Sequence, residues 1–148
     1  MKEPENNPIT NELIVRPIGV IRTPFATPEE TPKAGVVKPD AEGCIELQAR
    51  YAEAAASIKP GRRYMLLFWF HKSDPDYAMT VHWRGYGALM GLFSTHSPSR
   101  PNPIGVSTVT VTRIEPPEDQ GPMRIWFTGV DMTDGTPLLD IKSRDQYP

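Results

Sequence analysis

The sequence IGVSTVTVTRI at residues 104–114 decides the fold class. Valine alternates with threonine from Ser107 to Thr112, so apolar side chains fall on one face of an extended strand and hydroxyl groups on the other. The β-branched residues also favour extended backbone over helix. This stretch therefore predicts a β-strand with one face in a core and the other in water or against a partner.

Similar runs of β-branched and aromatic residues recur along the chain and predict a mainly β protein. We expect strands at residues 13–21, 64–70, 88–93, 104–114, 123–130 and 138–141. The apolar run at residues 64–70 is continuous, which indicates a strand covered on both faces. A sheet of this kind closes best as a barrel, because closure leaves no free edges.

The 17 prolines and 11 glycines interrupt long periodic stretches, so we expect one short helix and several stiff loops. Residues 47–58 predict the helix, because alanine and glutamate are frequent there and apolar residues recur at spacings of three to four. The loops at residues 23–39 and 94–105 contain four and three prolines. Rigid polar loops on a β scaffold commonly carry binding residues, so both loops are candidate parts of a site.

The composition limits the class of protein. With 148 residues, 39% of them hydrophobic, the chain can bury one core and is too short for two ordinary domains. We expect a flexible N-terminal segment at residues 1–12 and a single domain at residues 13–148. No apolar run approaches the ~20 residues needed to cross a bilayer, and residues 1–12 contain no secretory signal. Cys44 is the only cysteine, so an internal disulfide is impossible and we expect a cytoplasmic protein.

The formal net charge of −2 hides an uneven distribution. Residues 1–60 carry 7 basic and 9 acidic side chains, residues 61–113 carry 6 and 2, and residues 114–148 carry 3 and 7. The basic middle part could attract a phosphate-bearing partner, with arginines that merely solvate loops as the alternative.

Common catalytic signatures are absent or misplaced. The glycines at residues 85–87 lack the spacing and the strand-turn-helix context of a dinucleotide loop. No phosphate loop, nucleophile elbow or zinc-binding HExxH sequence occurs. His71, His82 and His96 lie 11 and 14 residues apart, which provides no local pair of ligands, so we expect no metal.

Three segments share an unusual set of polar residues: WFHKS at 69–73, FSTHSPSRPNPIGVS at 93–107 and VDMTDGTPLLDIKS at 130–143. The order and the sequences of these segments resemble the TsaA-like family of S-adenosylmethionine-dependent tRNA (adenine-N6)-methyltransferases. These enzymes methylate threonylcarbamoyl-adenosine next to the anticodon. The resemblance begins at VRPIGVIRTPF, residues 15–25, and its most specific motifs are SRPNPIG and DGTPLLDIK.

The resemblance implies a single-sheeted, mostly antiparallel β-barrel that works as a homodimer on tRNA, with S-adenosylmethionine near the subunit interface. We expect the short form of the family, without the C-terminal domain that several members carry. The implied cofactor contacts are Pro32, Lys33, Ala34, His71, Lys72, His96, Val106, Asp134, Gly135, Thr136 and Pro137.

The sequence departs from the usual family pattern at three places. Pro32-Lys33-Ala34 replaces Pro-Arg-Gln, His96 replaces an arginine, and DIKSR at residues 140–144 replaces DIKPY. Lysine lacks the bidentate fork of arginine, alanine lacks the amide of glutamine, and an imidazole changes its charge near neutral pH. If His96 contacts the cofactor carboxylate, cofactor affinity should weaken from about pH 5.5 to about pH 8, and His96→Arg should remove that dependence.

Methyl transfer requires alignment of donor and acceptor and removal of a proton from the acceptor nitrogen. Asp134, His71, His96 and Tyr147 are candidate proton acceptors, and the resemblance favours Asp134 and His71 as the catalytic residues. The structural alternatives are a turn residue for Asp134 and the end of a strand for His71.

Arg100 and Asn102 are the candidate substrate-binding residues, because prolines restrict their loop. The guanidinium group can bind a carboxylate or phosphate, and the amide can bind an adenine edge or hold the loop's own shape. Aromatic side chains in strand contexts are more often core residues than base-stacking platforms. Four occur here: Trp69, Phe70, Trp83 and Trp126.

Two further hypotheses stay open. The altered residues Lys33, Ala34 and His96 are compatible with a non-catalytic module that senses S-adenosylmethionine. The net acidity and the short chain are compatible with a methyltransferase for a small-molecule acceptor. Methyl-transfer assays on total RNA and on small metabolites distinguish these hypotheses from tRNA methylation.

Overall fold

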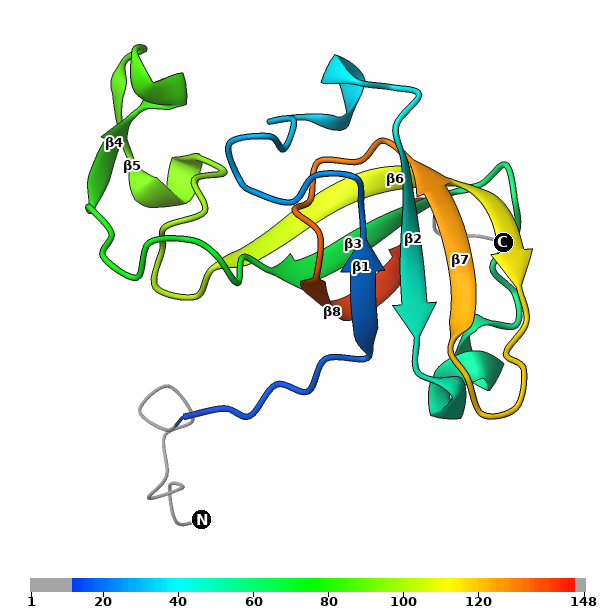
Figure 1. The fold of residues 1–148 in the computed structure, drawn as a ribbon. Coiled ribbons are helices and arrows are strands. Elements are labelled where there is room, and N and C mark those ends of the chain that lie inside the picture. Colours follow the sequence, from blue (N-terminus) through cyan, green and yellow to red (C-terminus); the bar gives the residue numbers. More distant parts are fainter. Residues whose placement is uncertain (1–11, 146–148) are drawn as a thin grey trace.

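Six strands form a closed antiparallel barrel in the order β1-β2-β7-β6-β3-β8 in the computed structural model, which describes residues 12–145 (Figure 1). They are β1 (Gly19–Arg22), β2 (Glu42–Leu47), β3 (Arg63–Trp69), β6 (Ile104–Glu115), β7 (Met123–Thr128) and β8 (Thr136–Ser143). The pairing of Gly19 with Leu138 joins β1 to β8 and completes the ring. Each of these strands therefore has a hydrogen-bonded neighbour on both sides.

A second, smaller unit projects from the barrel between β3 and β6 (Figure 1). β4 (Thr80–His82) and β5 (Leu89–Gly91) form a two-stranded antiparallel sheet, and we call residues 77–93 the arm. Four 3₁₀ helices complete the described structure: η2 (Gly35–Val37), η3 (Ala49–Ala55), η4 (Trp83–Gly85) and η5 (Leu92–Ser94). No helix in residues 12–145 is both long enough and apolar enough to span a bilayer.

The core fills the inside of the barrel, where side chains of alternate strand positions meet. On β7, Met123, Ile125 and Phe127 point inward and are buried. Gly43, which pairs with Phe127 across β2 and β7, leaves room for that ring, since an added Cβ would lie 2.6 Å from the phenyl Cζ. Phe127 has 0% of its surface exposed and is one of the largest fully buried side chains of the core.

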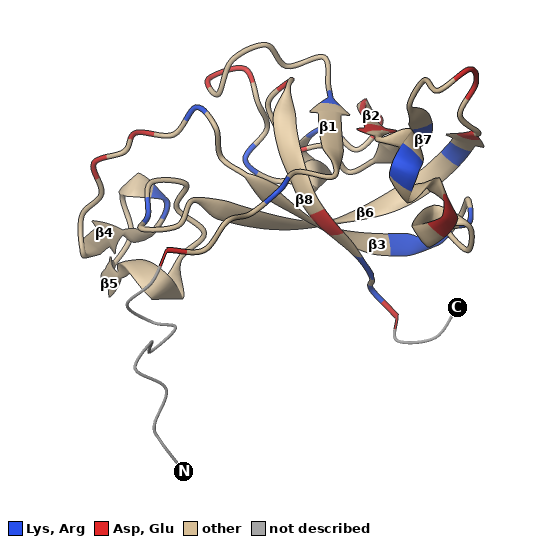
Figure 2. Ribbon diagram, turned by 90° about the horizontal axis from the view of Figure 1, so that it is seen from below, with Lys and Arg blue, Asp and Glu red and all other residues tan. Residues whose placement is uncertain are grey.

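Ion pairs cover part of the outer face of the barrel, where acidic and basic residues lie together (Figure 2). Glu46 on β2 accepts a hydrogen bond from Arg22 Nε at 2.8 Å and lies 3.6 Å from Arg124 Nη2. Arg113 lies between Glu42 and Glu115 in the same way. The charge of Arg113 is therefore balanced by carboxylates, so this part of the basic middle segment offers little attraction to phosphate.

The mainly β prediction is confirmed, but several predicted strand limits are wrong. Residues 13–17 are exposed and form no strand, because Pro17 interrupts the backbone donors and β1 finds its partners only from Gly19 onward. Residues 88–93 contribute β5 and η5, both outside the barrel order. On β3 the burial alternates, so only one face of that strand lies in the core.

The helix predicted at residues 47–58 is shorter and of another type. Leu47 belongs to β2, and the helix is the 3₁₀ helix η3 (Ala49–Ala55). Its hydrogen bonds join residues three apart, as from the Tyr51 amide to the Gln48 carbonyl at 2.9 Å. A segment this short gains too few hydrogen bonds to nucleate an α-helix, and burial of Ala55 holds it on the core instead.

Candidate functional site

One end of the barrel carries most of the predicted site residues, and we call it the site end. β1, β3 and β7 end there, while β2 and β8 begin there. The proline-rich loop at residues 23–41, the β7–β8 loop at residues 129–135 and the segment after β3 therefore converge (Figure 1). The helix η3 lies at the opposite end.

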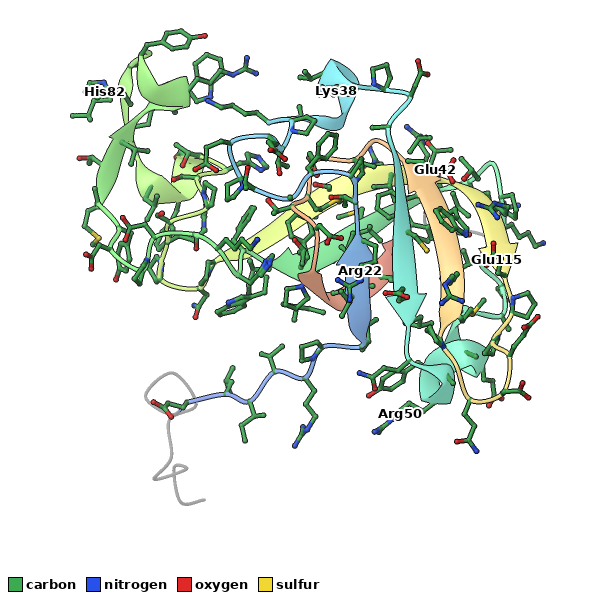
Figure 3. The ribbon with its side chains drawn as sticks, in the orientation of Figure 1. Arg22, Lys38, Glu42, Arg50, His82 and Glu115 are labelled. Carbon is green, nitrogen blue, oxygen red and sulfur yellow. The ribbon has the colours of Figure 1, made fainter. Side chains whose placement is uncertain are left out.

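Asp134 ties the β7–β8 loop to the end of β1. Its backbone amide donates to the Phe25 carbonyl at 2.7 Å, and its Oδ1 accepts the Thr23 amide at 3.0 Å. Arg22 Nη1 lies 3.9 Å from Oδ2, and Figure 3 shows the Arg22 side chain on the outer side of β1. Asp134 is thus a turn residue, as its sequence context indicated, and it also keeps a partly exposed carboxylate at the site end.

His71 lies against the turn formed by Asp134 and Gly135. Gly135 has a φ of +82°, and a Cβ added there would lie 3.8 Å from both His71 Nε2 and Arg22 Nη1. Desolvation of the ring and the charge of Lys72 lower the pKa of His71, and the Asp134 carbonyl and carboxylate oppose them only in part. A neutral imidazole is therefore favoured near neutral pH, and it can accept a proton.

Side-chain contacts beyond those of Thr23 also fasten the loop at residues 23–41 over this end. Lys72 Nζ donates to the Ala26 carbonyl at 3.0 Å. The hydroxyl groups of Thr31 and Thr133 lie 2.9 Å apart, which joins the loop to the β7–β8 connection. The predicted contact residues of the loop and of β8 are therefore held at the same end of the barrel: Pro32, Lys33, Ala34, Thr136 and Pro137.

Asp131 is a further carboxylate at the site end, and the sequence analysis missed it. Its Oδ1 accepts the Ser107 hydroxyl at 2.7 Å. Burial raises the pKa of Asp131, while the Ser107 bond and the charge of His96 act in the opposite direction. The charge of His96 thus acts on this carboxylate, whereas Val106, the neighbour of Ser107 on β6, is 42% exposed on the opposite face of the strand. The available signal for Asp131 was its position three residues before Asp134 in VDMTDGTP.

Arg100 is engaged within its own loop. Its Nη1 donates to the carbonyls of Thr95 at 2.9 Å and Ser97 at 3.1 Å, and the guanidinium lies 5.9 Å from the centre of the Phe93 ring. These contacts give Arg100 a role in the shape of the loop. Asn102 is exposed nearby.

A hollow of 300 Å³ lies beside His71, between the end of β3 and the proline-rich loop before β6. Trp69, Phe70 and Tyr77 form aromatic walls, and Arg100 also lines it. The Phe70 amide donates to the Pro103 carbonyl at 2.7 Å, which fixes the two sides together. Flat aromatic walls next to a few polar groups suit a heteroaromatic ring.

The remaining candidates lie elsewhere. Trp83 is 45% exposed on the arm, so a core role is wrong for this residue. Trp126 lies on the barrel wall, where the Arg113 guanidinium lies 4.4 Å from its ring centre. Tyr147 falls outside the described residues. Within residues 12–145, no three His, Cys, Asp or Glu side chains form a group that could hold a metal ion.

Comparison with known proteins identifies the family. The model of the tRNA-methyltransferase O N-terminal domain matches residues 20–147. The chain belongs to this family. A solved structure of TrmO from Pseudomonas aeruginosa is 32% identical, with a TM-score of 0.67, and covers 93% of this chain and 58% of its own. The family resemblance recognised in the sequence is thereby confirmed.

Two relatives illustrate the range of the tRNA-methyltransferase O family. The S-adenosyl-L-methionine-binding protein of Archaeoglobus fulgidus is 35% identical over 130 residues, which are 88% of each chain. The human tRNA (adenine(37)-N6)-methyltransferase is 30% identical over 139 residues, which are 90% of this chain and 30% of the human protein. The chain thus matches nearly the full length of the archaeal relative and a minor part of the human one.

Proposed function

We propose that this protein is an S-adenosylmethionine-dependent methyltransferase that acts on N6 of threonylcarbamoyl-adenosine next to the anticodon of tRNA. We further propose that it is a cytoplasmic homodimer. Family membership and the activity in the name of the human relative support the reaction. The observation that carries the proposal is the position of His71, whose pKa is lowered, between the Asp134–Gly135 turn and the aromatic hollow.

The donor groups at the site end fit the cofactor. S-adenosylmethionine carries a sulfonium and an ammonium cation, a carboxylate and an adenosine group. Asp131 is half-buried and its pKa is raised by desolvation, so a cation beside it would favour its charged form. Lys33 supplies positive charge for a carboxylate, and the positive φ of Gly135 allows close approach of a ligand to the backbone. When bound, the cofactor supplies an electrophilic methyl group.

The chain's own residues then align the acceptor and take its proton. Trp69, Phe70 and Tyr77 hold the base by its faces in the hollow and exclude water from it. An N6 nitrogen that carries a carbamoyl group is a poor nucleophile until it loses its proton, and neutral His71 accepts that proton. The Asp134–Gly135 turn, which lies against the imidazole, limits the orientations open to His71.

Cofactor binding is expected to require Asp131 and no metal. Isothermal titration calorimetry of chelator-treated protein should detect S-adenosylmethionine binding well below millimolar concentration. Asp131→Asn should weaken the affinity roughly tenfold to a hundredfold, because a charged hydrogen-bond partner is lost. Asp140→Asn, at a half-exposed carboxylate on β8, is the control and should bind like the wild type. Absence of heat at millimolar cofactor would contradict the proposal.

The fit of η2 against the β7–β8 loop is expected to control cofactor affinity. A Cβ on Gly35 would lie 2.5 Å from the Gly129 carbonyl oxygen, so Gly35→Ala must push η2 away from that loop. We expect the variant to bind S-adenosylmethionine about tenfold more weakly, which is about 1.4 kcal/mol. Gly91→Ala is the matched control, because no heavy atom lies within 4 Å of its added Cβ. Equal affinities in the two variants would show that η2 does not border the cofactor site.

A second candidate function is binding of S-adenosylmethionine without catalysis. It is favoured by the archaeal relative, which shares 88% of its length with this chain and is named for binding alone. Incubation with methyl-labelled cofactor and unmethylated total tRNA, or with a pool of small metabolites, separates the candidates. Label in tRNA supports the proposal, label in a metabolite indicates a small-molecule acceptor, and cofactor binding with no transfer indicates a sensor.

A further inference from the structure

The arm exposes an unusual share of large apolar side chains. The exposed fractions are 45% for Tyr77, 76% for Met79, 45% for Trp83, 80% for Tyr86, 61% for Leu89 and 79% for Phe93. Within the described residues, β4 and β5 pair only with each other. Two strands without a sheet behind them are marginally stable in water, and a contiguous exposed apolar surface marks an interaction site.

The tip of the arm is held in one conformation. Arg84 has a φ of +55° and Gly85 a φ of +81°, which forms a tight reversal between β4 and β5. The Gly87 amide donates to the Trp83 carbonyl at 2.7 Å, and a Cβ on Gly87 would lie 3.1 Å from the indole Cε3. The indole of Trp83 therefore packs on the backbone of its own turn, which lowers the conformational entropy that this side chain loses on binding.

The charge of the arm points to a polyanion. The arm contains no Asp or Glu and one basic residue, Arg84; Arg100 follows in the next loop, and Asp74 and Asp76 precede the arm. The Arg84 guanidinium lies 4.7 Å from the centre of the Trp83 ring, and that of Arg100 lies 5.9 Å from the Phe93 ring. Aromatic faces next to guanidinium groups are the combination that binds bases by stacking and phosphates by charge.

The arm also continues from the candidate acceptor site. Tyr77, at its foot, lines the hollow beside His71. Phe93, at its other foot, begins the loop that carries His96 and Arg100. In Figure 3 the labelled His82 lies on the arm, well away from the barrel, so side chains follow the arm outward from the site. Nucleotides that flank a base held in the hollow would therefore meet the arm.

We propose that the arm is a stacking surface for single-stranded RNA, on which the nucleotides next to the target base lie against Trp83, Tyr86 and Phe93 while Arg84 meets their phosphates. The proposal rests on the proposed function and names the surface that would hold its substrate. A second copy of the chain is the other possible occupant of an apolar surface. Charge favours RNA, because two arms face to face would bring arginines together with no carboxylate on either arm.

The test compares the binding of an anticodon stem-loop RNA to the full chain and to arm variants by fluorescence anisotropy. Tyr86→Ala and Trp83→Ala should each weaken binding about fivefold to a hundredfold, and Tyr86→Phe should bind like the wild type, because stacking needs only the ring. Arg84→Gln should reduce the slope of log affinity against log salt by about one. Leu13→Ala, at a residue 80% exposed outside the arm, is the control and should change nothing.

Cofactor titration and light scattering on the same variants make the outcome decisive. Tyr86 is 80% exposed, so Tyr86→Ala should leave cofactor binding unchanged. Unchanged cofactor binding then excludes misfolding as the cause of weaker RNA binding. Unchanged RNA affinity in Tyr86→Ala and Trp83→Ala would overturn the arm proposal. If the wild type still methylates tRNA in that case, the proposed function stands without it. A shift from dimer to monomer without loss of RNA affinity would also overturn the arm proposal and assign the arm to the subunit interface. Failure of the wild type to bind any RNA would overturn the proposed tRNA reaction as well.

Discussion

The His71→Gln variant should transfer methyl groups to tRNA at least about 100-fold more slowly than the wild type. Glutamine keeps a polar group of similar reach beside the Asp134–Gly135 turn, so cofactor affinity should change only a few-fold. It cannot accept a proton, however, and the carbamoylated nitrogen then has no base. Single-turnover assays with saturating cofactor isolate this step, because they exclude product release. A rate within a few-fold of the wild type would remove His71 from the chemistry.

The pH profile of the wild type provides an independent check on His71. Its protonated form is inactive as a base, so the rate should rise with pH through the pKa of His71 and then become level. Desolvation and Lys72 lower that pKa, so the midpoint should lie below the ordinary imidazole value of about 6.5. Lys72→Gln removes the positive charge that disfavours protonation of His71, so the midpoint should move to higher pH. Lys142→Gln, at an exposed lysine on β8, should leave it unchanged.

The strands that were predicted well have a sequence pattern that agrees with their burial in the barrel. β6 and β7 alternate apolar and polar residues, and the barrel buries one face of each, so the period in the sequence matches the burial. β2 was missed because EGCIEL has no such signal: Gly43 is there to make room for Phe127, and Glu46 is there to pair with Arg22 and Arg124. These reasons exist only once the neighbouring strands are in place.

The site shows the same division between local and long-range information. The sequence motifs identified His71 and Asp134 as candidates, because both residues lie in short segments whose residue order is distinctive. The bond between Ser107 and Asp131 joins residues 24 positions apart, so no local pattern could predict it. Trp83 was expected in a core because its neighbours resemble a strand, whereas the positive φ values of Arg84 and Gly85 turn the chain there and leave the indole exposed.

Phe127→Ala should lower the free energy of unfolding by about 3 to 5 kcal/mol, because it removes a fully buried ring and leaves a cavity. Phe93→Ala is the matched control, since the same side chain is 79% exposed there, and its effect should stay within about 0.5 kcal/mol. Urea denaturation with linear extrapolation measures both values.

Because Gly43 pairs with Phe127, the packing of the Phe127 ring can also be tested as a coupling energy between the two residues. Gly43→Ala alone should destabilise the protein by about 1 to 3 kcal/mol, because the new Cβ would lie 2.6 Å from the phenyl Cζ. In the double variant the missing ring removes that clash and the new methyl group fills part of the cavity. The double variant should therefore be more stable than the sum of the single effects by at least about 1 kcal/mol. Additive effects would mean that the two residues do not meet, and the pairing of Gly43 with Phe127 in the β2–β7 register would then be wrong.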